Sequence, residues 1–200
     1  MKKYAIMALA MLSGAVFAAD AAAPAAAAPV SKNMLYDGSF DTVKAMSTGR
    51  HWGLYKNGVY YGWIGDSNLK PTDGKCELDN TVFSSKPASL KMTNQGNGKA
   101  VTIGQHLHYY KLKLTPGKKY RLSFMIKLQD VEKPGVCLLV WNNKNIWFPY
   151  MKGTSDWQKI EYTYTASADS NKAERLQYTF RLGGKGTVWV DDVVFEEVAE

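Results

Sequence analysis

Residues 118–128 read KKYRLSFMIKL, and from Tyr120 onward apolar and polar side chains alternate. Successive side chains of a β-strand point to opposite faces, so strict alternation indicates a strand with one buried face. The apolar members, which we expect in the core, are Tyr120, Leu122, Phe124, Ile126 and Leu128. The stretch therefore predicts a β-strand, and it places Arg121 on the outer face.

The same alternation continues in later segments. In RLQYTFRL, residues 175–182, it sends Gln177 and Arg181 to the outer face, and in GVCLLVW, residues 135–141, it sends Trp141 there. Turn-forming residues separate the segments, and no long stretch has a helical period. The predicted strands are 33–40, 59–64, 75–78, 89–93, 100–108, 119–128, 136–141, 157–165, 175–182 and 187–196. About ten strands without helices predict an all-β fold, a β-sandwich of the jelly-roll type.

The first residues predict export. Lys2 and Lys3 precede an apolar stretch, Tyr4–Phe17, and Ala18 suits a cleavage site, which is the pattern of a signal peptide. The apolar stretch is shorter than the roughly 20 residues of a membrane span, so we expect a secreted or periplasmic protein without one. The predicted organisation is a signal peptide over 1–18, an Ala- and Pro-rich linker over 19–32, and one domain over 33–198.

The formal net charge of the chain is +7, and it is spread without a run of Lys or Arg. Nucleic-acid binding usually concentrates basic side chains on one surface. The charge pattern therefore predicts a solvated basic surface and no nucleic-acid partner.

The chain contains two cysteines, Cys76 and Cys137. They are too far apart in sequence for a redox CxxC motif, and without clustered histidines they make a poor zinc site. Because exported proteins commonly oxidise such pairs, we expect one disulfide between them.

Two aromatic clusters occur in stretches rich in Gly or Asn: HWGLYKNGVYYGW, residues 51–63, and WNNKNIWFPY, residues 141–150. Flat rings stack on the C–H face of a sugar, and planar polar side chains bind its hydroxyls. Core packing is the alternative for each ring, and solvent contact is the alternative for each polar side chain. The candidates for sugar binding are Trp52, Tyr61, Trp63, Trp141 and Trp147 for stacking, with Gln105, Arg121, Gln177 and Arg181 for hydrogen bonding.

The stretch GTVWVDDVVFEEV, residues 186–198, places Asp191 and Asp192 inside an otherwise apolar strand. Neighbouring strand residues face opposite ways, so one carboxylate faces whatever the strand packs against. A buried carboxylate is costly unless it is paired. The partner of the buried carboxylate could be a Lys or Arg, the main-chain amides of a turn, or a metal ion.

Several stretches, in this order and spacing, resemble the carbohydrate-binding modules of the family 4, 9 and 22 group. They are NMLYDGSFDT (33–42), SSKPASLKMTN (84–94), IGQHLHYYKLKLTPGKKYRLSFMIK (103–127), DWQKIEYTYTA (156–166) and GTVWVDDVVF (186–195). The resemblance spans essentially the whole predicted domain. It implies a galactose-binding-like jelly roll that binds sugars, with Gln105 in the binding strand.

Modules of this group commonly hold a structural Ca²⁺ at the junction of their first and last strands. The resemblance therefore implies calcium as a cofactor, with ligands drawn from the Asp41 carboxylate, the main-chain carbonyls of Ser39 and Lys86, and one of Asp191 and Asp192. Ca²⁺ binds about six to eight oxygens, so carbonyls and carboxylates suit it together. Asp192 is the preferred ligand of the pair, and the resemblance fits either.

These observations predict a secreted, non-catalytic carbohydrate-binding domain that docks on a polysaccharide or glycan. A second class is a structural or assembly protein of the cell envelope that binds a protein partner with the same fold. A third is a small polysaccharide-active enzyme, because carboxylates distant in sequence could meet in the fold. The sequence has no GxSxG motif, no Cys/His nucleophile setting and no Gly-rich phosphate loop, so we expect no catalytic residues.

Overall fold

The computed structural model describes residues 32–41, 51–56, 59–65, 70–142, 144–172 and 176–198. For the first strand, and for the second as far as Tyr61, it describes the backbone alone. These residues belong to one compact unit, residues 31–200. The predicted signal peptide over 1–18, and the linker over 19–32 apart from Lys32, lie outside the described residues. Within the described ranges, no helix has the length and apolar character needed to cross a membrane.

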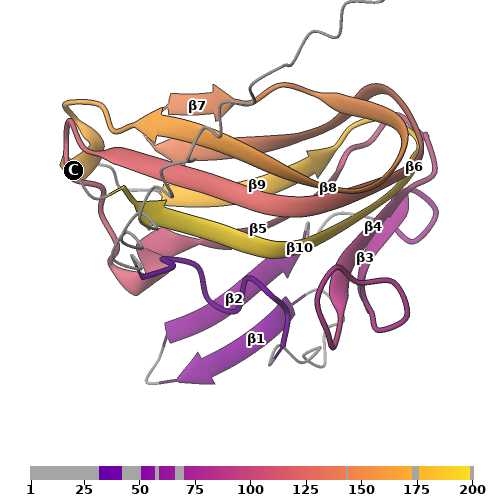
Figure 1. Ribbon diagram of the computed structural model, residues 1–200, viewed down its shortest axis with the longest axis horizontal. Helices are drawn as coiled ribbons and strands as arrows, with labels where there is room; N and C mark the ends of the chain where they lie inside the picture. The colour runs from indigo at the N-terminus through magenta and orange to yellow at the C-terminus, as the bar shows by residue number, and fades with distance from the viewer. Residues whose placement is uncertain are drawn as a thin grey trace, which may run out of the picture. The chain divides into compact units, whose positions relative to one another are not determined.

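The described residues form strands joined by turns, with two short 3-10 helices (Figure 1). The strands are β1 (His51–Lys56), β2 (Val59–Gly65), β3 (Gly74–Asp79), β4 (Ser89–Asn94), β5 (Val101–His106), β6 (Lys119–Asn142), β7 (Lys144–Trp147), β8 (Met151–Thr165), β9 (Leu176–Leu182) and β10 (Gly186–Glu197). The 3-10 helices are η1 (Leu107–Tyr110) and η2 (Ser170–Lys172). The prediction of an all-β fold is confirmed.

Strand β6 belongs to both layers of the sandwich. Its first half, 119–129, pairs with β10, and its second half, 136–142, pairs with β9. Strand β8 pairs with β6 on both sides of the bend, and Figure 1 shows the two strands curving together. The first sheet is thus β3-β4-β10-β6-β8 and the second is β1-β2-β5-β9-β6-β7, with antiparallel pairing throughout.

The core lies between these two sheets. The five apolar side chains of residues 120–128 predicted to be inside are at most 2% exposed, and so are Leu176, Tyr178, Phe180 and Leu182 of β9. The rings of Phe124 in the first sheet and Phe180 in the second meet edge to face, with centroids 5.0 Å apart. Each large apolar side chain removed from water contributes about 1.5–3 kcal/mol, so this alternating set contributes strongly to the stability.

The strands differ from the prediction in several places, among them the start of β8 at Met151 and the end of β5 at His106, where η1 follows. Residues 33–40 form turns, with positive φ at Asp37 and Phe40, and the Asn33 side chain bonds main-chain atoms of Val193 and Phe195. The segments predicted as two strands, 119–128 and 136–141, are one bent strand because their pairing with β8 continues through the bend. Strands β1 and β7 were not predicted, since Gly- and Asn-rich clusters weaken the strand pattern.

The paired aspartates of β10 lie at a register shift between Asp191 and Val194, where Asp192 has φ 49°. Asp191 is fully buried, and its Oδ2 accepts hydrogen bonds of 2.9 Å from the amides of Ser84 and Ser85. Its Oδ1 accepts a third, of 2.8 Å, from the amide of Asp192. The buried carboxylate is therefore satisfied by main-chain amides, and it ties the loop before β4 to β10.

The two cysteines are free, so the predicted disulfide is wrong. Cys76 lies in β3 of the first sheet, where it packs against the core. Cys137 lies in β6 of the second sheet between the inward-facing Val136 and Leu138, so its thiol is on the side away from the core. The Cys76 sulfur lies 4.0 Å from the Thr102 carbonyl of β5, two strands from Cys137, whose thiol is on the other side of that sheet, so the two sulfurs stay apart.

Burial gives Asp191 a testable pH dependence. It raises the pKa of Asp191 from 3.8 to about 6, while the three amides oppose the shift. A carboxyl whose pKa is higher in the folded state stabilises the fold as the pH falls through that pKa, so the native protein gains about 1 kcal/mol from this group between pH 7 and pH 5. Urea unfolding of the wild type and of Asp191→Asn at both pH values measures it. The stability difference between the two proteins should be larger at pH 5 than at pH 7. An equal difference at both pH values would contradict the raised pKa of Asp191.

The thiols give a second prediction. Titration of the unreduced, denatured protein with a thiol reagent should find two thiols per chain. In the native protein Cys137 should react slowly, because burial hides it and raises its pKa, which leaves little thiolate. If the unreduced, denatured chain has no reactive thiol, Cys76 and Cys137 form a disulfide after all.

Candidate functional site

The outer face of the second sheet collects four of the nine predicted sugar-binding residues, Trp141, Trp147, Gln177 and Arg181. The register of β6, β9 and β5 aligns Trp141 with Gln177 and His106 in one row, and Cys137 with Arg181 and Thr102 in another. Between these rows lies a third, formed by Leu139, Thr179 and Gly104. These residues alternate with core residues such as Leu138 and Phe180, so they lie on the opposite side of the sheet. We call this surface the outer face.

Gly104 occupies the centre of the outer face, where it is buried. A Cβ at this position would overlap the Tyr178 carbonyl oxygen and the Thr179 side chain. Glycine therefore lets β5 and β9 approach closely, and it leaves the strand without a side chain between the two flanking rows. The hydroxyl-bearing Thr179 is half-buried beside it.

An exposed ring, Trp147, stands at one edge of the outer face. Strand β7 places it opposite Leu139, and its side chain is 47% exposed. The Arg181 guanidinium lies 6.0 Å from its ring centroid, and the Tyr150 ring stacks beside it at 6.5 Å with an interplanar angle of 17°. Trp147 is thus held by a cation–π contact and a neighbouring ring while one side stays open to solvent.

Tyr150 links this ring pair to the sheet. Its hydroxyl interacts with the thiol of Cys137 and the guanidinium of Arg181. Partial burial, together with Cys137, raises the pKa of Tyr150, so the hydroxyl stays protonated and remains a hydrogen-bond donor. Sequence reasoning missed Tyr150 as a site residue because it follows Pro149 in a loop, where alternation gives no information about direction.

A second ring group lies across the sheet. Tyr109 of η1 is 48% exposed, and its ring centroid lies 4.4 Å from that of His108 and 5.4 Å from that of His106. Strands β6 and β9 lie between this group and β7, which corresponds to a separation of about 14 Å at the usual strand spacing. Ring groups therefore flank both sides of the outer face, and Tyr109 was not among the predicted site residues.

Three of the predicted sugar-binding residues lie elsewhere. Trp63 is fully buried, packs 5.1 Å from the Phe40 ring, and donates its Nε1–H to the Asp37 carbonyl, so the prediction that it stacks on sugar is wrong. Gln105 is also fully buried, and its amide bonds both main-chain polar atoms of Tyr36. Its role is to hold the N-terminal segment.

Arg121 lies on the first sheet, not the second. Its guanidinium forms an ion pair with Glu196 of the neighbouring β10, with Nε 2.7 Å from the carboxylate oxygen. It therefore cannot act with Gln177 and Arg181 on one surface. Trp52 of β1 pairs in register with Trp63, and Tyr61 lies in β2, but their side chains lie outside the described part.

The carboxylates expected to bind Ca²⁺ have other partners in the structure. Asp191 does not fit, because the amide hydrogens that point at both of its oxygens occupy the positions a cation would take. Asp192 accepts a hydrogen bond from the Ser85 hydroxyl, and Asp41 accepts one from the Ser39 hydroxyl, both of 2.7 Å. Among described residues, no three His, Cys, Asp or Glu side chains converge as metal ligands.

The comparison with protein families gives one match, to the model described as BppA domain 1, over residues 36–195. Among curated proteins, none matches the chain.

Several solved structures share the fold. The enzymatically active domain of tailspike protein 4 of bacteriophage CBA120 is 12% identical with a TM-score of 0.58; the match covers 83% of this chain but only 21% of that one. The CBM22-1 xylan-binding domain of Paenibacillus barcinonensis Xyn10C is 13% identical over 85% of this chain and 97% of that one, with a TM-score of 0.53. A Stig cyclase from Fischerella sp. TAU is 13% identical over 83% and 97%, with a TM-score of 0.57.

These three structures bear on the fold and not on the activity, since their identities are low and their titles name different functions. The family model is more specific, because it spans the described domain from the turn at Tyr36 to the end of β10. The chain belongs to the BppA domain 1 family of carbohydrate-binding modules, of the family 4 and 9 type.

Proposed function

We propose that this protein is a non-catalytic domain that docks on a polysaccharide through the outer face of the second sheet. The observation that carries the proposal is Trp147, which is 47% exposed and braced by Arg181 and Tyr150 on a face that also presents Gln177 and Thr179. A ring held in one orientation loses little freedom when it stacks on a sugar, so binding keeps more of the contact energy.

The arrangement of the outer face favours an extended ligand. Ring groups flank both sides of the outer face, and Gln177, Thr179 and Arg181 lie on the strand between them. A single sugar would contact one ring group, whereas an oligosaccharide crossing the strands reaches both. The guanidinium of Arg181, the amide of Gln177 and the hydroxyl of Thr179 offer hydrogen bonds to the hydroxyls of the sugars between them.

The chemistry of the outer face supports binding more than catalysis. Glycoside hydrolysis generally uses two carboxylates about 5–10 Å apart. The side chains that line this face are aromatic, amide, hydroxyl, thiol and cationic. We place the protein in the periplasm or outside the cell, and this location rests on the predicted signal peptide alone.

Replacing Trp147 by Ala should weaken binding to a polysaccharide by roughly 1–3 kcal/mol, because the stacking surface is lost. Affinity electrophoresis against a polysaccharide panel, with a reducing-sugar assay on the same glycans, measures both binding and cleavage. Trp157→Ala is the matched control, since Trp157 lies in β8 of the first sheet and should leave retardation unchanged.

Three outcomes of this experiment would contradict the proposal. If Trp147→Ala and the wild type are retarded equally by every glycan that binds, the outer face is not the binding surface. Release of reducing sugar would make the protein an enzyme. Retardation by no glycan would favour a protein partner in the cell envelope.

A structural Ca²⁺ remains a prediction, and Asp41 and Asp192 are the carboxylates left for it. If they bind the ion with the carbonyls of Ser39 and Lys86, Ca²⁺ at 100 times its dissociation constant should raise the unfolding free energy by about 2.7 kcal/mol. Thermal unfolding with Ca²⁺ and with EDTA measures this. The response should vanish in Asp41→Ala and persist in Asp191→Asn, and a melting temperature indifferent to both reagents would exclude the ion.

A further inference from the structure

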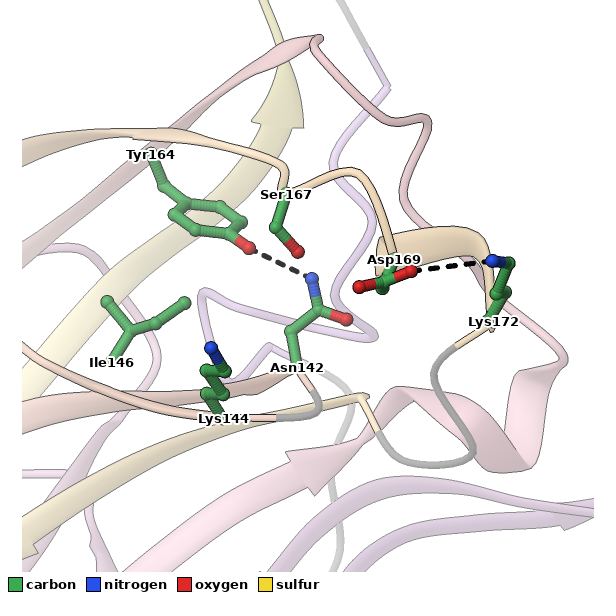
Figure 2. A pocket seen from close by; sticks show the side chains of 7 residues that line it. All are labelled: Asn142, Lys144, Ile146, Tyr164, Ser167, Asp169 and Lys172. Atoms are coloured by element: carbon green, nitrogen blue, oxygen red, sulfur yellow. Dashed lines mark hydrogen bonds and ion pairs between the residues drawn. The ribbon is translucent and has the colours of Figure 1, made fainter.

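A pocket of about 440 Å³ opens at one end of the sandwich, between β7 and the end of β8 (Figure 2). It is lined by Asn142, Lys144, Ile146, Tyr164, Ser167, Asp169 and Lys172. Ile146 pairs with the inward-facing Val140, so it lies on the opposite side of β7 from Trp147. The pocket is therefore distinct from the outer face, and its volume suits a small ligand.

The deepest polar group of the pocket is the carboxamide of Asn142, which is only 3% exposed. Its Nδ2 donates to the Tyr164 hydroxyl at 2.9 Å and to the Ser170 hydroxyl at 2.6 Å. Its Oδ1 has no hydrogen-bond partner. Because hydroxyls both donate and accept, the amide can turn over, and in either orientation one polar end stays without a protein partner.

An unsatisfied amide end in a buried position costs about 1–3 kcal/mol. A ligand hydroxyl that reached Asn142 would remove this cost, so the pocket is prepared for a polar group at this depth. Part of the pocket wall is apolar and would pack against the carbon atoms of a ligand, since Ile146 and the ring of Tyr164 lie on one side of the amide in Figure 2. A ligand with hydroxyls on an apolar carbon ring satisfies both features.

The charges around the pocket do not balance. Lys172 lies 3.4 Å from Asp169, and no ion pair of Lys144 occurs among the described residues. Figure 2 shows the Lys144 amino group on the same side as Ile146, facing the pocket. Among the described lining residues, two lysines and one aspartate leave one positive charge in excess, which favours a ligand with a single negative charge.

We propose that this pocket binds one sugar residue that carries a carboxylate, that is, a hexuronate. Lys144 binds the carboxylate, Asn142 binds a ring hydroxyl, and Ile146 with Tyr164 covers one face of the ring. The site is separate from the outer face, so it does not depend on how that surface binds a polysaccharide.

The test is an NMR titration of the ¹⁵N-labelled protein with glucuronate and galacturonate, and with glucose and galactose as uncharged counterparts. The uronates should shift the amide signals of 142–146 and 164–172, and the neutral sugars should bind more weakly. Lys144→Gln should weaken uronate binding roughly fivefold or more, as expected for the loss of one charged contact. Lys159→Gln, which removes a charge from β8 away from the pocket, should not weaken it.

A second variant tests the amide without removing its packing. Asn142→Asp keeps the shape and still accepts hydrogen bonds from Tyr164 and Ser170, but its charge repels a carboxylate, so uronate binding should be lost. Trp147→Ala should leave it unchanged, which separates this site from the outer face. The proposal is overturned if uronates shift none of these signals, if neutral sugars bind equally well, or if Lys144→Gln binds like the wild type.

Discussion

The structure depends on one constraint: strand β6 must serve two sheets at once. Its first half pairs with β10 and its second half with β9, so the two layers are covalently continuous through its bend. Alternation along β6 then decides which side chains face the core from both sheets. The Phe124 and Phe180 rings, one from each sheet, pack against each other in that core. Gly135, with φ 106°, lies at the bend, where a Cβ would overlap the Met151 carbonyl.

The outer face is a consequence of the same alternation. Because Leu138 and Val140 face inward from β6, Leu139 and Trp141 face outward, and antiparallel pairing aligns them with Thr179 and Gln177. The side chains that fill the core and those that meet a ligand are therefore neighbours in sequence. A one-residue slip of β9 would exchange the two sets, so folding and binding are specified by the same register.

Three polar side chains, two of them fully buried, attach loops to the sheets. Asn33, Gln105 and Asp191 each bond main-chain atoms of a distant segment, and in this way they attach the N-terminal turn and the loop before β4 to the sheets. Main-chain groups left unpaired beside a core are costly, so each of these side chains stabilises the fold by more than its own hydrogen bonds suggest. Asn142 differs from them, because its two partners are side-chain hydroxyls and one end of its amide faces the pocket.

The sequence alone determined the all-β class and the inward residues of β6 and β9, because period-two alternation is local and survives any arrangement of the sheets. It also determined that Gln177 and Arg181 share a side of their strand. Only the tertiary structure decided that Trp63 and Gln105 are buried, that Arg121 lies on the other sheet, and that Cys76 and Cys137 stay apart, since these depend on which strands pair. The partners of Asp191 were equally beyond the sequence, because two of its three amides come from a loop more than 100 residues away.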